Sequence, residues 1–532
     1  MEWNVADLFE SVVDALPPDR VGLVCGDEKR TYPELDARAN RVAHHLLRAG
    51  VGPGDHVALY LGNCAPYVET LIGCLKIRAV PINVNFRYVE DELLYLLRDS
   101  DAVAVLHQRG FAPRVAAVLE KLPRMKTILS VEDGSGEDLG ALGARDYEDS
   151  VAVESSERDF GKRSPEDLFV LYTGGTTGMP KGVLWRQEDF FFSALMGANP
   201  MAPPPEKPGD VAERARTKPP MGGMSAAPLI HGAAQLSTLM ALLQGYKAIL
   251  VPRFDPELVW SLVERERAQT LSIVGDAVAR PLAEKLAEPG FACDLSSLLV
   301  LSSAGAILSQ AIRADLKTRL PKLVILDAFG ASETGSQGAE AGGVQPDGGI
   351  RFKMNENTLV LDEDGKRVAP GSGALGRLAL RGRIPLGYYN DPEKTARTFF
   401  SYDGVRYVIP GDLARPEVDG TITVFGRGSQ CINSGGEKIF PEEVEGALKS
   451  HPDVFDVVVV GVPDEKWGQK VTAVVQPRPG RTLVLDELAA HARKHVAGYK
   501  VPRALRIVDQ IVRSPSGKPD YPWARAEAQK AE

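Results

Sequence analysis

A glycine- and threonine-rich stretch at residues 172–182, which reads YTGGTTGMPKG, is the strongest local signal in the chain. It follows an apolar run from Leu168 to Tyr172 that is typical of a short buried strand. Glycines let backbone N–H groups approach an anion, and threonine hydroxyls and Lys181 add donors and a positive charge. The stretch therefore predicts a loop that holds a nucleotide polyphosphate. A plain glycine-rich turn at a strand end is the alternative.

The stretch differs from a P-loop in the position of its lysine. Lys181 stands between Pro180 and Gly182, whereas the P-loop pattern requires a glycine before the lysine and a serine or threonine after it. A P-loop NTPase is therefore a disfavoured alternative.

Alternating strand and helix patterns surround this stretch. Thr31 and Glu34 form a capping-box pattern, and apolar residues at helical spacing follow until Gly50. A strand at 56–61, a helix at 65–77 and a strand at 79–84 predict a βαβ unit, and thus a parallel sheet covered by helices. Further core strands are expected at 102–106, 168–172, 248–251, 270–274, 298–302 and 323–326.

The rest of the chain divides by texture. Residues 200–220 are rich in proline and charge, which predicts a long surface loop. From Gly371 the pattern changes to short strands and turns, and residues 426–429 look like a junction. Strands at 457–460, 471–475 and 504–508 and a helix at 485–496 predict a small α+β unit. We expect an N-terminal domain at 1–426, a hinge at 427–429 and a C-terminal domain at 430–532.

Composition excludes several classes of protein. The 532 residues carry a net charge of −9, with 44% apolar and 25% charged residues, which suits a globular enzyme and argues against a nucleic-acid binder. The five cysteines stand far apart and the histidines lack ligand spacing, so reduced thiols and no zinc site are expected. No leader and no long apolar run is visible, which predicts a cytoplasmic protein. Peripheral membrane contact and a homodimer stay open.

Five motifs, in this order, resemble those of the adenylate-forming superfamily, which contains acyl- and aryl-CoA synthetases, peptide-synthetase adenylation domains and luciferases. They are the loop at 172–182, Phe329 to Gly335, Gly411-Asp412, Gly426-Arg427 followed by Asn433 to Glu445, and Ser514 to Lys518. The resemblance covers nearly the whole chain. Three segments, 173–189, 228–232 and 275–281, look like the actinobacterial acyl-CoA synthetases of steroid side-chain breakdown.

The resemblance implies a fold and an activity. The fold would be α/β, with a large N-terminal domain of layered, mainly parallel sheets, a small β-subdomain and a small mobile α+β C-terminal domain. The activity would be ATP-dependent activation of a carboxylic acid, a fatty acid or a bulky steroid side-chain acid, to acyl-AMP, followed by transfer to coenzyme A, with Mg²⁺ as the metal. Transfer to a carrier-protein phosphopantetheine and a non-catalytic binding relative are the alternatives. The latter predicts loss of Glu333 or Lys518, and both are present.

The resemblance also implies roles for individual residues. Thr173, Gly174, Gly175, Thr176, Thr177, Gly178 and Lys181 would cradle the β- and γ-phosphates. Ala304, Gly305 and Ala306 would form one wall for adenine, with Asp327, Ala328, Phe329 and Gly330 opposite. Asp412 would accept the ribose hydroxyls, Arg427 would add a cation nearby, and Gly435, Gly436 and Glu437 would face the thiol channel.

Four residues are the expected catalytic set. Besides Lys181, these are Glu333 as the magnesium ligand, Lys518 as the cation that stabilises adenylation, and His231 as an acyl-pocket gate. The plain alternatives are a solvated glutamate, a surface lysine and a packed core histidine. For Asp412 the alternative is a turn aspartate, and for the small residues of the adenine wall it is close packing.

Two positions depart from the superfamily pattern. Ser332 stands where relatives usually have threonine, so the hydroxyl that would contact the α-phosphate is kept and the methyl is lost. Ser429 stands at the hinge where relatives usually have aspartate or lysine. Rotation of the small domain about residues 427–429 is still expected, and the departure at Ser429 leaves open how this rotation is controlled.

Overall fold

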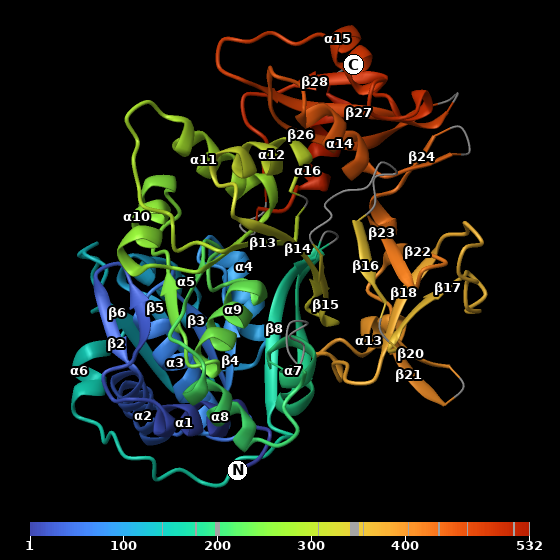
Figure 1. Cartoon of the computed structure of the whole chain (residues 1–532). Coiled ribbons are helices and arrows are strands. Elements are labelled where there is room, and N and C mark those ends of the chain that lie inside the picture. The colour runs from blue at the N-terminus through green and yellow to red at the C-terminus, as the bar shows by residue number, and fades with distance from the viewer. Residues whose placement is uncertain are drawn as a thin grey trace.

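The computed structural model describes residues 1–140, 142–175, 178–196, 203–306, 308–340, 350–354, 356–402, 404–434, 437–464, 467–513 and 517–530. Figure 1 shows a large N-terminal part built on two helix-covered sheets, a β-rich unit beside it, and a smaller C-terminal unit above.

The larger central sheet has eight strands, and its core is parallel. Its order is β15-β14-β13-β12-β10-β11-β1-β2, and only the edge strands β15 and β2 pair antiparallel. The strands are β1 (Val21–Cys25), β2 (Glu28–Thr31), β10 (Gly222–Ser225), β11 (Lys247–Leu250), β12 (Thr270–Ile273), β13 (Val300–Ala304), β14 (Val324–Ala331) and β15 (Gly335–Glu340).

The second sheet has five parallel strands in the order β4-β3-β5-β6-β7. They are β3 (His56–Tyr60), β4 (Val80–Asn83), β5 (Ala102–Gln108), β6 (Thr127–Val131) and β7 (Arg145–Asp146). The predicted βαβ unit is confirmed as β3, α3 (Ala65–Lys76) and β4. Its strands are continuous apolar runs because helices cover both faces of a parallel sheet.

Helices cover these two sheets. They are α1 (Val5–Ala15), α2 (Tyr32–Arg48), α3 (Ala65–Lys76), α4 (Glu90–Asp99), α5 (Ala112–Leu119), α6 (Tyr147–Ala152), α7 (Gln187–Ala194), α8 (Gly209–Thr217), α9 (Gly232–Leu243), α10 (Pro256–Glu266), α11 (Gly275–Ala287) and α12 (Gln310–Arg319). The capping box of Thr31 and Glu34 is confirmed at the start of α2, and α2 ends just before Gly50, whose φ is +84°.

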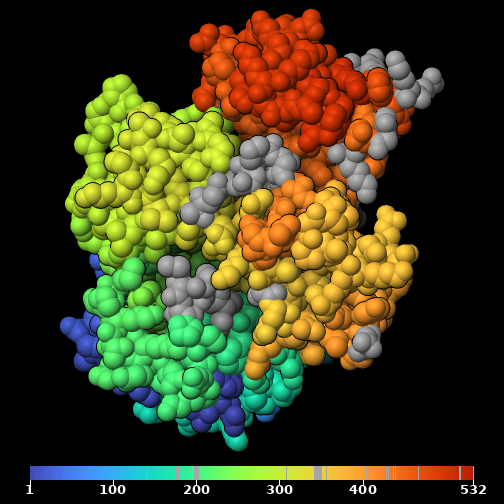
Figure 2. Space-filling view, turned by 45° about the vertical axis from the view of Figure 1, so that its right-hand side comes forward, coloured from blue at the N-terminus to red at the C-terminus, as the bar shows by residue number. Residues whose placement is uncertain are grey.

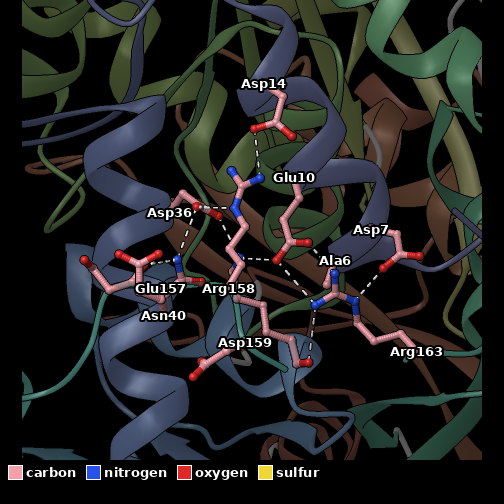
Figure 3. A network of polar contacts seen from close by, with 12 residues as sticks. Ala6, Asp7, Glu10, Asp14, Asp36, Asn40, Glu157, Arg158, Asp159 and Arg163 are labelled. Carbon is pink, nitrogen blue, oxygen red and sulfur yellow. Dashed lines mark hydrogen bonds and ion pairs between the residues drawn. The ribbon is translucent and has the colours of Figure 1, made fainter. Parts of the chain in front are cut away.

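A long polar network ties α1 to the segment that precedes strand β8 (Leu168–Gly175). Arg158 of this segment reaches between α1 and α2 and donates to Asp36 (Figure 3). Arg163 of the same segment donates to Asp7 of α1 and to Lys76 O at the end of α3. Lys76 of α3 joins the network with a side chain that is fully buried, 2.5 Å from Glu10 and 2.7 Å from Asp36. Buried charges are tolerated because each one has an opposite partner.

The glycine-rich stretch lies on an antiparallel ribbon. Strand β8 (Leu168–Gly175) pairs with β9 (Gly178–Arg186), and β19 (Gly387–Tyr388) pairs with the other side of β9. The strand at 168–172 is therefore confirmed and is longer than predicted. Strand β9 was not predicted, because glycine and proline in its first half interrupt the strand pattern.

An antiparallel sheet forms the β-subdomain. Its order is β16-β23-β22-β18-β21-β20, with β17 on β18. The strands are β16 (Ile350–Lys353), β17 (Thr358–Leu361), β18 (Gly376–Arg381), β20 (Phe399–Tyr402), β21 (Val405–Val408), β22 (Asp412–Pro416) and β23 (Thr421–Arg427), and α13 (Pro392–Thr398) lies beside β20.

The C-terminal unit is a mixed sheet with helices. Its order is β25-β24-β27-β26, with β28 parallel to β27. The elements are β24 (Ile432–Ser434), β25 (Glu437–Ile439), α14 (Pro441–Lys449), β26 (Val454–Asp464), β27 (Gly468–Pro477), α15 (Leu485–Ala492), β28 (Ala504–Ile507) and α16 (Tyr521–Gln529). In the space-filling view it caps the yellow-green residues of the N-terminal part (Figure 2).

The predicted fold class is confirmed, and one expectation is wrong. The segment at 200–220 is not a structureless loop, because α8 spans Gly209–Thr217. Val211 and Ala215 are four residues apart on one face of α8 and are buried. The high content of proline and charge hid this short apolar face. The domain boundaries at 426 and 430 stay a prediction.

Candidate active site

The phosphate-loop candidates lie at the tip of the β8–β9 hairpin. Thr173 stands opposite Lys181, and Gly175 stands opposite Gly178. Gly174 lies between them on β8, and Thr176 and Thr177 lie outside the described residues. A side chain at Gly182 would lie 2.8 Å from the ring of Tyr172, so glycine lets the two strands pair closely here.

Lys181 is held by partners that the sequence did not reveal. Its Nζ donates to the Tyr95 hydroxyl at 3.0 Å and lies 3.4 Å from Asp391 and 3.9 Å from Asp99. The hydrogen bond to Tyr95 raises the pKa of Lys181, and the charges of the two carboxylates add to this effect. The hairpin is thereby tied to α4 and to the start of α13.

Asn83 joins the hairpin to the segment that carries His231. Its side-chain oxygen accepts from Tyr172 N at 2.9 Å, and its amide nitrogen donates to Tyr172 O at 2.8 Å and to Ile230 O at 2.7 Å. Asn83 could not be predicted as part of the site, because a single buried asparagine at a strand end has no local sequence pattern.

The turn between β14 and β15 carries Ser332 and Glu333. Glu333 is buried, and its Oε1 accepts a hydrogen bond from the Tyr388 hydroxyl at 2.8 Å. Trp185 of β9 donates to Ser332 O at 3.0 Å. The next glycine, Gly335, has φ +69°, and a Cβ there would lie 2.2 Å from a backbone oxygen of α7, so the turn requires glycine.

His231 is brought to the same turn. It is half-buried and precedes α9 directly, and a Cβ at the neighbouring Gly232 would lie 3.8 Å from Ser332 Oγ and 3.3 Å from Leu171. The start of α9, β8 and the Ser332 turn therefore meet. This position suits a residue that lies beside a reacting carboxylate.

The two walls expected around adenine occupy the ends of adjacent parallel strands. Ala304 stands opposite Ala328 in the β13–β14 register, and Gly305 and Ala306 follow β13 directly. Within the opposite wall, Asp327 is buried and accepts a hydrogen bond from Arg313 at 2.5 Å. Phe329 stacks on Phe352 with ring centroids 5.0 Å apart, and Gly330 next to it is exposed.

Lys518 reaches the first of these walls from the C-terminal unit. A Cβ at Gly305 would lie 3.3 Å from Lys518 Cε, so the lysine side chain passes directly over this glycine. The preceding Gly517 has φ +78° and contacts Val274 and Ala277 at the start of α11. Gly305 and Lys518 are more than two hundred residues apart in the sequence. They meet because the C-terminal unit docks on the N-terminal part.

The ribose candidates are neighbours on one ribbon. Asp412 begins β22, is buried, and stands opposite Arg427 at the end of β23. Glu442 of α14 lies against this ribbon, since a Cβ at Gly426 would lie 2.8 Å from Glu442 Oε1. Burial and the nearby charges of Glu445 and Asp412 raise the pKa of Glu442 to about 8.

The thiol-channel candidates lie elsewhere. Glu437 is an exposed residue of β25, opposite Ser434 of β24, and Gly435 and Gly436 lie outside the described residues. Figure 1 shows β24 at the outer edge of the C-terminal unit, away from β13. The structure thus brings Lys518, and not this hairpin, to the strand ends.

Two family models match the chain. The model of AMP-binding enzymes matches residues 9–389, and the model of the AMP-binding enzyme C-terminal domain matches residues 443–518. The chain belongs to the AMP-binding enzyme family. The predicted membership of the adenylate-forming superfamily is confirmed.

Several curated AMP-binding enzymes are similar over the full length. The medium/long-chain-fatty-acid–CoA/3-oxocholest-4-en-26-oate–CoA ligase of Mycobacterium tuberculosis is 49% identical over 530 residues, which cover 99% of this chain and 96% of the relative. The 3-oxocholest-4-en-26-oate–CoA ligase of Rhodococcus rhodochrous is 48% identical over 533 residues, with the same coverage.

Solved structures of AMP-binding enzymes share the fold. The anthranilate CoA ligase AuaEII with anthranoyl-AMP superposes with a TM-score of 0.85 at 24% identity, covering 99% of this chain and 98% of that one. ATP-bound MatB from Rhodopseudomonas palustris gives 0.81 at 24% identity, with 98% of each chain covered.

The donor set of this AMP-binding enzyme fits a magnesium ion that is held chiefly by its substrate. Within the described ranges, no three His, Cys, Asp or Glu side chains converge to hold a metal by themselves. Glu333 supplies a buried carboxylate that the Tyr388 hydrogen bond orients at one oxygen. Mg²⁺ commonly takes one or two carboxylates and completes its shell with phosphate oxygens and water.

The described part of the chain also contains no helix with the length and apolarity to span a membrane.

Proposed function

We propose that this AMP-binding enzyme activates a carboxylic acid with ATP and passes the acyl group to coenzyme A. One observation carries the proposal: the Lys518 side chain lies over Gly305, at the strand ends that also carry Glu333. A cation in that place would face the charge that develops during adenylation, which stabilises a transition state more than a ground state. Similarity to full-length CoA ligases at 48–49% identity supports it.

The first half-reaction joins the acid to the nucleotide. A carboxylate oxygen attacks the α-phosphorus, and the bond from that phosphorus to the bridging oxygen of pyrophosphate breaks. The tip of the β8–β9 hairpin would bind the β- and γ-phosphates, and Asp412 would accept hydrogen bonds from the ribose hydroxyls. A magnesium ion beside Glu333 would neutralise phosphate charge.

The second half-reaction releases AMP. The thiol sulfur attacks the acyl carbonyl carbon, a C–S bond forms, and the bond from that carbon to the AMP oxygen breaks. We propose that the C-terminal unit turns about residues 427–429, so that Lys518 withdraws and the β24–β25 hairpin with Glu437 faces the thiol. The Arg503 guanidinium, which donates to Ser434 at 3.0 Å and lies 3.8 Å from the Trp467 ring centroid, supports an acceptor that carries phosphates.

For the acid itself we propose a medium- or long-chain fatty acid or a steroid side-chain acid. The names of the similar ligases from Mycobacterium tuberculosis and Rhodococcus rhodochrous support this class. Gly232 and Ala233 at the start of α9 would present small side chains to a bulky acyl group bound next to the Ser332 turn.

The test uses the purified chain with Mg·ATP and a panel of acids. We expect acid-dependent release of pyrophosphate, and AMP plus a thioester when CoA is added. Thioester formation only with a phosphopantetheine carrier protein would assign the other acceptor, and absence of acid-dependent pyrophosphate release would refute the proposal. Replacing Lys518 with alanine should abolish most adenylation but spare transfer from supplied acyl-adenylate. Equal loss in both steps would remove its assigned role.

A further inference from the structure

The turn that carries Lys518 docks on the first turn of α11. A Cβ at Gly517 would lie 3.3 Å from Val274 Cγ1 and 3.5 Å from Ala277 Cβ. Because α11 belongs to the N-terminal part, this contact exists only while the C-terminal unit is in the pose seen here.

Asp276, in the same turn of α11, has a buried carboxylate whose two oxygens have different kinds of partner. Its Oδ1 accepts a hydrogen bond from Ser309 N at 2.8 Å. Its Oδ2 is buried without a hydrogen bond and lies 3.6 Å from Lys449 Nζ and 3.9 Å from Arg280. Lys449 is itself buried and comes from α14 of the C-terminal unit. A buried carboxylate is costly unless an opposite charge compensates it, so this carboxylate suits the docked pose.

Side chains of alternating charge continue from Lys449 to the turn that carries Lys518. Lys449 Nζ lies 3.8 Å from Asp456, and Arg513 binds both oxygens of Asp456 at 2.7 Å. Arg513 Nη1 then donates to Gly517 O at 3.1 Å. That carbonyl belongs to the peptide bond that leads into Lys518. We call Asp276, Lys449, Asp456 and Arg513 the charge chain.

The charged residues of the charge chain stabilise one another across the interface between the N-terminal part and the C-terminal unit. Burial opposes the charge of Arg513, but its hydrogen bonds to Asp456 and the charges of Asp456, Glu445 and Asp276 raise its pKa above the ordinary value. Burial opposes the charge of Asp456 in the same way, and Lys449 and Arg513 nevertheless lower its pKa. Arg513 and Asp456 are therefore both charged at neutral pH.

We propose that Asp276 is a positioning residue that holds Lys518 over Gly305 by way of the charge chain. Since only Asp276 belongs to the N-terminal part, its attraction is lost when the C-terminal unit turns away. It therefore favours the pose for adenylation and contributes nothing to acyl transfer. The inference rests on the proposed function.

Replacing Asp276 with asparagine tests this role. The amide oxygen can still accept from Ser309 N, so the change removes charge and little else. We expect the kcat of acid-dependent pyrophosphate release to fall about tenfold, which corresponds to about 1.4 kcal/mol, while the KM for ATP stays within about twofold. The rate of thioester formation from supplied acyl-adenylate should stay the same or rise. A residue with a merely structural role would lower both half-reactions.

A second ion pair across the same interface provides the matched control. Glu284 of α11 accepts from Arg478 of the C-terminal unit at 2.9 Å, but both side chains are over one-third exposed. Exposed pairs contribute about 0–1 kcal/mol, so Glu284→Gln should change either half-reaction by less than about fivefold. The double variant Asp276→Asn/Lys449→Met should lose less adenylation activity than the sum of the losses, in free energy, of the two single variants. Each single change already removes the same Asp276–Lys449 interaction.

The outcomes separate this inference from the proposed function. Wild-type protein without acid-dependent pyrophosphate release would refute the proposed function. Wild-type activity with equal losses in both half-reactions of Asp276→Asn, or with no loss in either, would overturn the positioning role. If Asp276→Asn does not fold, Lys449→Met carries the same test, since it removes the other partner from the C-terminal side. Restoration of adenylation by Asp276→Glu supports the role of the charge.

Discussion

Tyr388→Phe removes one hydroxyl beside the proposed magnesium ligand and leaves the ring in place. The hydroxyl donates to Glu333 Oε1 at 2.8 Å. The ring packs edge-on against Phe399 at 5.8 Å and lies under the Lys394 ammonium at 4.4 Å, and phenylalanine keeps both contacts. The change therefore acts on the orientation of the carboxylate and on little else.

The size of the effect follows from the charge of the acceptor. A hydrogen bond to a charged group contributes about 1.5–3 kcal/mol, and loss of a partner that orients a metal ligand commonly costs about 10–100-fold in metal affinity or activity. We expect kcat/KM for ATP in adenylation to fall at least about tenfold. The Mg²⁺ concentration that gives half-maximal activity should rise by a similar factor.

The assay is pyrophosphate release at saturating acid, titrated first with Mg²⁺ and then with Mg·ATP. Transfer of a supplied acyl-adenylate to CoA should be unchanged, because this step needs no metal-bridged triphosphate. The matched control is Tyr389→Phe, at the next residue in the sequence. It removes a hydroxyl that donates to Asp101 at 3.1 Å. An unshifted Mg²⁺ titration for Tyr388→Phe, or an equal shift for Tyr389→Phe, would refute the assignment of Glu333.

Two further predictions concern stability. Lys76→Met should lower the free energy of unfolding by about 3 kcal/mol, because it removes the fully buried cation that Glu10 and Asp36 share and leaves each carboxylate with only one arginine, Arg163 and Arg158 respectively. Denaturant unfolding should show no such loss for the exposed Lys162→Met. Glu442, with a folded-state pKa of about 8 against an ordinary 4.5, keeps a proton that the unfolded chain releases, so stability should fall as pH rises from about 5 to about 8. Thermal unfolding of Glu442→Gln should lack this fall, and parallel pH profiles would contradict the buried protonated state.

Elements with a largely apolar pattern could be predicted from the sequence, whereas two elements with an interrupted or narrow apolar pattern were missed. The strand at 56–61 and the helix at 65–77 were predicted within one residue, because burial on both faces leaves an uninterrupted apolar signal. Strand β9 and helix α8 were missed. In β9, glycine and proline serve the close pairing at the hairpin tip, and in α8 only one narrow face is buried.

In the candidate site, residues that belong to a sequence motif could be predicted, whereas residues that only the tertiary fold brings there could not. Residues within the five motifs, such as Glu333 and Lys518, could be named because their neighbours in sequence carry the resemblance. Asn83, Tyr388 and Asp276 could not, because each acts on a group far away in sequence and has no local pattern of its own. Such partners become visible only when the fold brings distant elements together.

The charge chain also bears on how a serine can stand at the hinge. Ser429 is the hinge position at which the resemblance to the superfamily leads us to expect aspartate or lysine, so this chain has no charge at that position that could favour one pose. In this protein the bias toward the adenylation pose comes instead from the interface, where Asp276 meets Lys449 at 3.6 Å. A contact of this kind stabilises only one pose, since rotation separates its partners, whereas a hinge residue moves little in either pose. Removing Asp276 should therefore shift the balance between the half-reactions more strongly than any substitution at Ser429.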